Sequence, residues 1–228
     1  MHKKSNNLQS GIFSKNSFES EFWAKNQTVC GIDEVGRGCL AGPLVTAAVI
    51  LPLGTNNPNL QDSKIMTEKE RLQAARWITK NCSYGFGIVH NRIIDTHNIW
   101  QATMIAMKKA LMQVMATSNH RPGAILIDAM PLDLSYTNCK DIPVYHFPKG
   151  EQLSSSIAAA SIIAKVKRDA IMDKLDSLFP GYYFEDHKGY GTKKHQQAIA
   201  TLSNSIIHRT SFTLKKEIYA GNHQQRIC

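Results

Sequence analysis

The chain has 228 residues and a mass of 25.5 kDa, which is enough for one substantial domain and short for two. Hydrophobic residues make up 43% and charged residues 20%, as in ordinary globular proteins, which excludes wholesale disorder, collagen and coiled coil. Lysine and arginine number 27 against 18 acidic residues, a net charge of +9. This charge suits a nucleic-acid partner and a merely basic protein equally, so the motifs must decide between them.

The cysteines and the apolar runs indicate a reducing compartment. Five cysteines are scattered without a C-x-x-C pair, which argues against a disulfide framework and a zinc ribbon. The longest apolar stretch, residues 40–53, is interrupted by Gly42 and Pro43 and is too short to cross a bilayer. Residues 5–10 are polar where a signal peptide would be apolar. We therefore expect a cytoplasmic protein.

The first part of the chain predicts a short helix and two strands. Aromatic residues within 13–23 are spaced as on one face of a helix, which we expect to dock on the body as an extension frayed at its beginning. Short β-branched runs at 29–33 and 44–51 predict two strands. The glycine-rich segment 36–42 predicts a tight connection between them.

The middle of the chain predicts two helices around a third strand. Thr67 and Glu70 form a capping box, so a helix begins there and continues to about residue 80. Residues 84–89 alternate with glycine and predict a strand that another backbone approaches closely. Apolar residues at helical spacing over 99–115 predict a helix whose four methionines fill the core.

The last part predicts two further strands and a long helix. Residues 121–123 form a turn, 124–128 a buried strand that ends in a charged residue, and 143–147 another strand. A helix over 154–178 ends before Pro180-Gly181. Early strands followed by alternating strands and helices are typical of an α/β domain, a mixed sheet with helices packed on its faces.

Three acidic residues are predicted to meet at one end of this sheet. Asp33 and Glu34 end the first strand, and adjacent carboxylates are costly to bury unless a cation shares them. Both reach one site only if the backbone turns there, which Gly36 and Gly38 permit. The pair alone would suit an exposed acidic turn, but Asp128 ends an apolar strand, where ligands of α/β sheets gather. Such an all-oxygen cluster suits Mg²⁺ or Mn²⁺ and indicates metal-assisted attack on a phosphodiester.

Ordered motifs run through most of the chain. The first reads Gly-Ile-Asp-Glu-Val-Gly-Arg-Gly at 31–38, with Leu-Ala-Gly-Pro at 40–43. The others follow in order: Asp-Ser-Lys at 62–64, the strand that ends at Asp128, Lys-Gly at 149–150, the helix 156–165, Arg-Asp at 168–169, His-Lys-Gly-Tyr-Gly-Thr at 187–192 with His195, and His-Arg and Ser-Phe at 208–209 and 211–212. Over about residues 30–212 the chain resembles ribonuclease HII, the type 2 ribonuclease H family.

The resemblance implies a ribonuclease H-like fold, a central mixed β-sheet flanked by α-helices with a small helical C-terminal part. It implies an endonuclease that hydrolyses the RNA strand of RNA/DNA hybrids and incises 5′ to ribonucleotides embedded in duplex DNA, leaving 5′-phosphate and 3′-hydroxyl ends. Four carboxylates would hold Mn²⁺ or Mg²⁺ while water attacks in line. A monomer is expected, and contact with a replication clamp is left open. The predicted division of the chain is an N-terminal extension, a catalytic domain and a C-terminal tail, at residues 1–28, 29–212 and 213–228.

The fourth acid departs from the family pattern. Bacterial members commonly have Lys-Gly-Asp before the long helix, whereas this chain has Lys-Gly-Glu at 149–151, one methylene longer. Asp169 is a rival for this place, although an i,i+4 ion pair with Lys165 explains it without catalysis. By resemblance, the predicted catalytic and metal-binding residues are Asp33, Glu34, Asp128 and Glu151.

The glutamate leaves two alternatives open. Catalysis could have been lost, which would leave a module that only binds hybrids. Type 3 ribonucleases H use glutamate at this place, but they lack the Gly-Arg-Gly segment and carry an extra N-terminal domain for which residues 1–29 are too short. The intact segment at 36–38 therefore favours type 2.

The resemblance also assigns residues to substrate binding. The backbone of Gly36, Arg37 and Gly38 would read the 2′-hydroxyl that distinguishes RNA from DNA. Tyr190 would pack against the deoxyribose at the junction. Ser63, Lys64 and Lys188 would contact phosphates, which makes binding salt-dependent. Without the resemblance, the segment around Tyr190 would more simply be a turn, and the lysines would more simply be solvated side chains. No catalytic role is assigned to three histidines, His187, His195 and His208, because they lack metal-ligand spacing on one helix.

Overall fold

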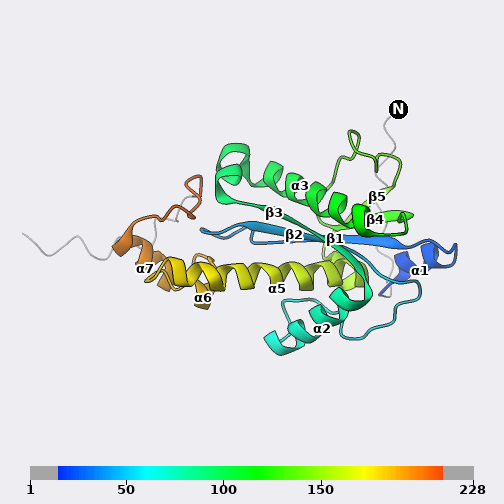
Figure 1. Cartoon of the computed structure of the whole chain (residues 1–228), viewed down its shortest axis with the longest axis horizontal. Helices are drawn as coiled ribbons and strands as arrows, with labels where there is room; N and C mark the ends of the chain where they lie inside the picture. Colours follow the sequence, from blue (N-terminus) through cyan, green and yellow to red (C-terminus); the bar gives the residue numbers. More distant parts are fainter. Residues whose placement is uncertain (1–14, 213–228) are drawn as a thin grey trace, which may run out of the picture.

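The computed structural model describes residues 15–212, and its centre is a mixed five-stranded sheet (Figure 1). The strands lie in the order β3-β2-β1-β4-β5, where β1, β2 and β3 are antiparallel neighbours and β4 and β5 run parallel to β1. The bounds are β1 Val29–Val35, β2 Leu44–Ile50, β3 Ser83–Val89, β4 Ala124–Asp128 and β5 Val144–Phe147. All five predicted strands are present, within two residues of their expected bounds. The expectations for Phe13 and for the tail 213–228 lie outside the described residues.

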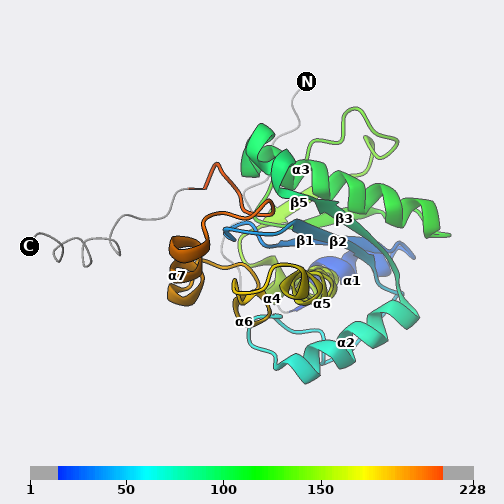
Figure 2. The ribbon, with the colours of Figure 1, turned by 60° about the vertical axis from the view of Figure 1, so that its left-hand side comes forward.

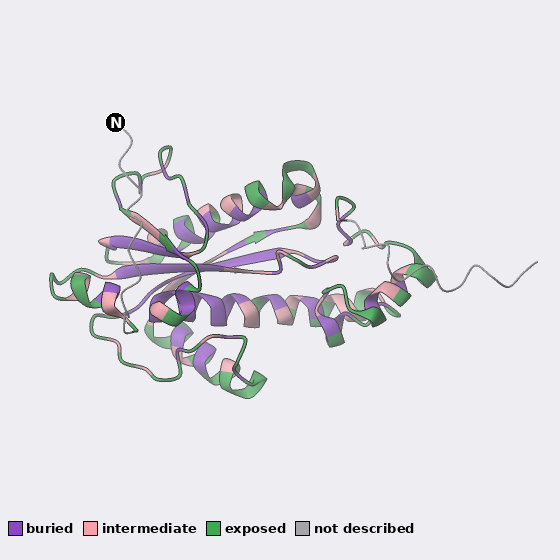
Figure 3. Ribbon diagram, turned by 180° about the vertical axis from the view of Figure 1, so that it is seen from behind, coloured by how far each residue is buried: buried purple, intermediate pink, exposed green. Residues whose placement is uncertain are grey.

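Helices cover both faces of the sheet. Helix α3 (Asn91–Thr117) lies on one face, and α5 (Ser155–Leu178) with α2 (Glu68–Asn81) lies on the other (Figure 1). Every residue of β2 is buried, and this strand is purple in Figure 3, so both of its faces belong to the core. A strand covered on both faces has to be apolar throughout, which explains why residues 44–50 do not alternate.

The glycines of β3 permit a close helix. A Cβ at Gly87 would lie 1.8 Å from the carbonyl oxygen of Ala106, and one at Gly85 would lie 2.5 Å from that of Ala110. Both carbonyls belong to α3, so the predicted approach of another backbone is confirmed. Helix α3 begins earlier than predicted, because Ile93 and Ile94 in its first turn pack in one cluster with Phe212 before Asn98 interrupts the helix at φ 64°.

The N-terminal helix α1 (Ser17–Trp23) docks on the body, as the aromatic spacing predicts. The ring of Phe18 lies 4.5 Å from that of Phe147, centroid to centroid. Glu19 is fully buried, and its Oε1 accepts hydrogen bonds from the Ser154 hydroxyl and the Ser156 amide. These groups begin α5, so the extension caps the long helix of the domain.

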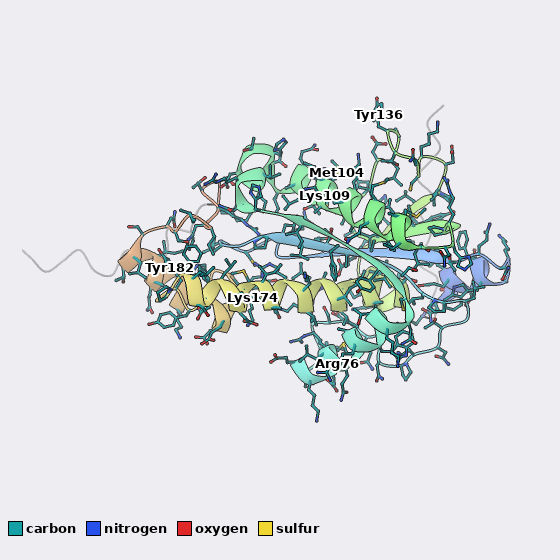
Figure 4. The ribbon with its side chains drawn as sticks, viewed as in Figure 1. Arg76, Met104, Lys109, Tyr136, Lys174 and Tyr182 are labelled. Carbon is teal, nitrogen blue, oxygen red and sulfur yellow. The ribbon has the colours of Figure 1, made fainter. Side chains whose placement is uncertain are left out.

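Short helices complete the fold. The single turn α4 (Gly150–Leu153), which the sequence did not predict, precedes α5. Helices α6 (Phe184–His187) and α7 (Lys193–Leu202) form the small helical part at the C-terminal end of α5 (Figure 1), and in Figure 2, where α5 is seen end-on, α7 lies to its left. Tyr182, labelled in Figure 4 near the end of α5, donates to the Ser203 carbonyl and ties this part together. Within residues 15–212, no helix combines the length and the apolar character needed to cross a bilayer.

Candidate functional site

Two of the predicted acids end neighbouring parallel strands. Ile32 of β1 pairs with Ile127 of β4, so Asp33 and Asp128 are the next residues along the two strands. Gly31 faces α5, so alternation along the strand places Asp33 on the same face. Asp33 is buried there, and the Ser161 side chain of α5 lies close enough to favour its charged form. The central strands thus bring two carboxylates to one end of the sheet, as the sequence predicts.

Glu34 leaves the sheet on the opposite face. Strand β1 continues to Val35, and the turn begins only at Gly36, which has φ +98°. The predicted turn therefore follows both acids. Because adjacent side chains of a strand point to opposite faces, Glu34 points to the face opposite Asp33. The Glu34 carboxylate accepts a hydrogen bond from Arg37, with 3.2 Å between Oε1 and Nη1. Its charge still acts on Asp33, so the acids remain electrostatic neighbours.

The turn α4 places Glu151 beside Asp128. The Gly150 amide donates to Asp128 Oδ1 at 3.0 Å, which holds the beginning of α4 against the end of β4. Glu151 is buried, and its carboxyl lies close enough to that of Asp128 for each to affect the pKa of the other. Lys64 Nζ lies 3.2 Å from Glu151 Oε1 and is 74% exposed. The longer side chain of the fourth acid is thus accommodated next to the third.

Burial and mutual repulsion disfavour ionisation of the first three acids. Burial, and then the charge of Glu34, raise the pKa of Asp33 well above its ordinary value. Burial raises the pKa of Glu34 to about 7 against the opposing effect of Arg37. Burial, and then the neighbouring Glu151, also raise the pKa of Asp128. Burial alone would raise the pKa of Glu151. The backbone, Asp128 and Lys64 favour its charged form more strongly, so its pKa lies below the ordinary value.

The donor set suits a hard divalent cation. The Oε2 atoms of Glu34 and Glu151 are buried, and neither has a hydrogen-bond partner among the described residues. Buried carboxylate oxygens need a partner, and oxygen is the ligand that Mg²⁺ and Mn²⁺ prefer. In their present positions, however, no three acidic, histidine or cysteine side chains of residues 15–212 are gathered closely enough to hold a metal ion. Binding one would require the carboxylates to rotate toward one another.

Asp169 is already paired within α5. Its Oδ1 lies 2.8 Å from Lys165 Nζ, the i,i+4 ion pair that the sequence predicts. Asp169 is eight residues from Ser161, about 12 Å along the helix axis at 1.5 Å per residue. Since Ser161 is the residue of α5 that contacts Asp33, Asp169 lies away from the acids at the sheet end.

Ser63 lies behind the acids rather than on the surface. Its hydroxyl is buried and lies 2.9 Å from that of Ser161, which in turn contacts Asp33. A surface phosphate therefore cannot reach this hydroxyl without a rearrangement. Lys64, the next residue, is exposed and stands beside Glu151.

Two loops with predicted substrate contacts lie together. Cys39 forms an isolated β-bridge with Tyr190, and the Leu40 amide donates to the Gly189 carbonyl at 2.9 Å. The exposed Gly38 and the 40% exposed ring of Tyr190 thus belong to neighbouring segments. Lys188 is less available than predicted, because its ammonium group is paired with Asp173.

Sequence reasoning missed three residues of this region. Ser161 belongs to the predicted helical motif 156–165, and Arg168 and Arg209 belong to two further motifs, but the sequence alone assigns none of the three a role. Both arginines are buried. The signal for Arg168 was present, because it shares a four-residue spacing with the buried Ala164 and Met172, and a charge on an apolar stripe requires partners.

Comparison with known proteins identifies the family. Residues 30–215 match the family Ribonuclease HII. A ribonuclease HII of Lactobacillus delbrueckii subsp. bulgaricus is 43% identical over 203 residues, which cover 89% of this chain and 75% of that protein. Proteins with this sequence identity over this share of both chains belong to one family.

Solved structures confirm the ribonuclease H-like fold. The structure of the PCNA:RNase HII complex from Archaeoglobus fulgidus matches with a TM-score of 0.68 and 23% identity, over 84% of this chain and 98% of that one. Ribonuclease H2 from Pyrococcus horikoshii OT3 matches with a TM-score of 0.63 and 21% identity, over 81% and 93%. Bst-RNase HIII in complex with Mn²⁺ matches with a TM-score of 0.55 and 23% identity, over 78% and 70%. The chain belongs to the ribonuclease HII family and is a hydrolase, an endonuclease of the ribonuclease H class.

Proposed function

We propose that this ribonuclease H cleaves on the 5′ side of single ribonucleotides in duplex DNA as well as within RNA/DNA hybrids, with a divalent metal ion. The products would be 5′-phosphate and 3′-hydroxyl ends. The observation that carries the proposal is the placement of Asp33 beside Asp128, and of Glu151 beside Asp128, at the sheet end, with Glu34 adjacent and buried carboxylate oxygens left without partners. This is the donor chemistry of a metal-dependent nuclease.

The four acids would hold the metal. Mn²⁺ or Mg²⁺, when bound, supplies a Lewis acid that activates water and neutralises charge on the leaving oxygen. The Gly150 amide orients the Asp128 carboxylate by a hydrogen bond, and the Ser161 side chain beside Asp33 would favour its charged form. The Mn²⁺ in Bst-RNase HIII, a protein of the same fold, supports this assignment.

The substrate would lie across the neighbouring loops. Arg37, Lys64 and Lys188 offer positive charge for phosphates, which would make binding weaken as salt rises. Gly36 and Gly38 would present backbone groups to the ribose, and the half-exposed Tyr190 would pack on a sugar. For Ser63 we propose a supporting role, in which its buried hydroxyl holds Ser161 against Asp33.

The glutamate does not by itself favour an inactive binding module. Glu151 reaches Asp128 despite its added methylene, because α4 is held against the end of β4. The exposed Gly38, within the Gly-Arg-Gly segment, favours reading of a single ribose over a type 3 preference for longer RNA. The monomeric state and the cytoplasmic location remain predictions.

A cleavage time course tests the proposal. The substrates are a DNA duplex with one ribonucleotide and a matched all-DNA duplex, each with Mg²⁺ and with Mn²⁺. Incision immediately 5′ to the ribonucleotide, absent from the all-DNA control, is the expected result. Tight binding without incision by either metal would instead identify a binding module.

Glu151 provides a prediction about the fourth acid. Glu151→Gln is expected to lower kcat by about 100-fold or more, because it removes a charge needed for the metal at unchanged size. Glu151→Asp is expected to stay within about tenfold of the wild type, because the carboxylate remains beside Asp128. Single-turnover rates on the one-ribonucleotide duplex measure both. Equal rates for Glu151→Gln and the wild type would remove Glu151 from the catalytic set.

Metal binding should also be visible without catalysis. A cation that relieves the crowded carboxylates stabilises the folded state, by about 2.7 kcal/mol at 100 times its Kd. For a domain of this size we expect Mn²⁺ to raise Tm by about 5–10 °C and EDTA to reverse the rise. Differential scanning calorimetry of the wild type and Asp128→Asn measures this shift. A rise of the same size in Asp128→Asn would show that the metal binds elsewhere.

A further inference from the structure

Two buried arginines stand where the substrate loops meet. Arg168 of α5 is fully buried, and Arg209, which follows α7, is 2% exposed. Within residues 15–212, neither forms an ion pair with a carboxylate. Burial lowers the pKa of Arg209 to about 10, so its guanidinium is still charged at neutral pH. A buried charge destabilises the fold unless it is well hydrogen-bonded, so each of these two guanidinium groups requires several hydrogen-bond acceptors.

Arg168 joins the two loops through three carbonyl groups. Its Nε donates to the Pro43 carbonyl at 3.0 Å and its Nη2 to that of Ala41 at 3.2 Å, both in the connection between β1 and β2. Its Nη1 donates to the Lys188 carbonyl at 2.7 Å, two residues before Tyr190. The guanidinium carbon lies 5.7 Å from the centroid of the Tyr190 ring. One side chain therefore sets the position of the tyrosine relative to residues 41–43.

Arg209 holds the Gly-Arg-Gly segment itself. Its Nη1 donates to the Arg37 carbonyl at 2.8 Å, and its Nη2 and Nε donate to the Gly42 carbonyl at 3.1 and 3.3 Å. Its own amide donates to the Leu40 carbonyl at 2.8 Å. The beginning and the end of the connection are thus tied to one planar group.

The contact with Arg37 determines where the next amide points. In a trans peptide the carbonyl and the following N–H point in opposite directions. Because Arg209 draws the Arg37 carbonyl into the protein, the Gly38 N–H is directed away from it. Gly38 is exposed, and a Cβ built on it would have no atom within 4 Å. Because Gly38 is exposed, an N–H directed away from the protein is accessible to a ligand.

Glycines make room for the arginines. A Cβ at Gly36 would lie 2.2 Å from Arg168 Nε, and one at Gly189 would lie 2.5 Å from the Ala41 carbonyl oxygen. Both glycines also have positive φ, +98° and +81°. The two loops can close around the guanidinium groups because these positions lack side chains.

We infer that Arg168 and Arg209 are positioning residues for ribose recognition, which hold the outward Gly38 amide and the Tyr190 ring in one fixed arrangement. This inference rests on the proposed function, since it concerns how a single ribonucleotide is selected. Arginine suits the task because its planar fork binds several carbonyls at once, whereas a lysine presents its donors from one atom. Neither arginine touches the four acids, so their loss should affect substrate selection more than the chemical step.

The test compares Arg168→Lys and Arg209→Lys with the wild type in cleavage and in binding. We expect KM on the one-ribonucleotide duplex to rise about tenfold or more while kcat changes by less than about threefold. In an Asp128→Asn background that prevents cleavage, fluorescence anisotropy measures Kd for the one-ribonucleotide duplex and for all-DNA duplex. The preference for the ribonucleotide should fall about tenfold in each arginine variant.

Controls separate this role from a general structural one. Arg121→Lys changes a guanidinium that donates to the Asn138 carbonyl, away from both loops, and should leave KM and the preference unchanged. The Mn²⁺-induced rise in Tm should persist in both arginine variants, because the acids are intact. If Arg168→Lys does not fold, Arg209→Lys tests the inference alone, since its partners lie within a single loop.

The outcomes distinguish the inference from the proposed function. An unchanged ribonucleotide preference in folded arginine variants would overturn the inference, as would a fall in kcat at constant KM. Failure of the wild type to incise at a ribonucleotide would overturn the proposed function instead. The binding preference is measured without cleavage, so it tests the arginines in either case.

Discussion

The Asp33→Asn variant is expected to lose about 1,000-fold or more in kcat, which is about 4 kcal/mol of transition-state stabilisation, while Kd for the substrate stays within about threefold. Asparagine keeps the size of the side chain and an oxygen that can accept from the Glu34 amide, now 2.8 Å from Asp33 Oδ1. The substitution removes the charge and replaces the other oxygen by an NH2 group. Since Asp33 lies beside Asp128 at the centre of the site, no neighbouring acid can replace that charge.

Single-turnover cleavage of the one-ribonucleotide duplex and anisotropy binding provide the two measurements. Asp128→Asn should behave like Asp33→Asn. Asp169→Asn is the matched control, because it removes an aspartate charge from the ion pair with Lys165 and should keep turnover within about twofold. Undiminished turnover in Asp33→Asn would exclude it from catalysis, and a loss in Asp169→Asn as large as in Asp128→Asn would make Asp169 a catalytic acid.

Gly31→Ala is expected to destabilise the fold strongly. A Cβ at Gly31 would lie 2.1 Å from the carbonyl carbon of Ser156 and 2.4 Å from the amide nitrogen of Ile157. These are backbone atoms of α5, so the clash cannot be relieved by a side-chain rotation. We expect the free energy of unfolding to fall by about 3 kcal/mol and Tm by about 6–12 °C. Activity should fall as well, because a displaced α5 moves Ser161 away from Asp33.

Thermal and urea unfolding of Gly31→Ala and Gly38→Ala form a matched pair. Each variant adds one methyl group to a glycine of the same motif, but a Cβ at Gly38 meets nothing within 4 Å. Gly38→Ala should therefore unfold within about 0.5 kcal/mol of the wild type. Equal stability of Gly31→Ala and the wild type would mean that β1 and α5 are farther apart than the structure shows.

Local patterns sufficed for most of the secondary structure. The capping box at Thr67 and Glu70 is present, with both of its hydrogen bonds, because it depends only on residues three apart. Helix α5 ends at Leu178, directly before the Pro180-Gly181 signal. Strands were recognisable from their β-branched composition even where burial on both faces removed alternation. The single turn α4 was missed because four residues carry too little periodicity to predict a helix.

Contacts between distant residues could not be read in this way. The hydroxyl of Ser63 suits a phosphate in sequence, yet packing turns it inward to Ser161, 98 residues away. The terminal extension was predicted to dock through aromatic rings, but the burial of Glu19 against the beginning of α5 was not. Such partners depend on how helices pack against the sheet, which no local spacing encodes.

By itself, the sequence determined the family, the α/β class and the order of the strands along the chain, and it named the candidate acids, because each depends on residue type, periodicity or ordered motifs. Only the tertiary structure decided which groups meet. It placed Asp33, Asp128 and Glu151 together, sent Glu34 to the opposite face, and buried Arg168 and Arg209 among the carbonyls of the substrate loops. The physical reason is that a buried charge is stable only with its particular partners, and those partners are assembled from distant segments by folding.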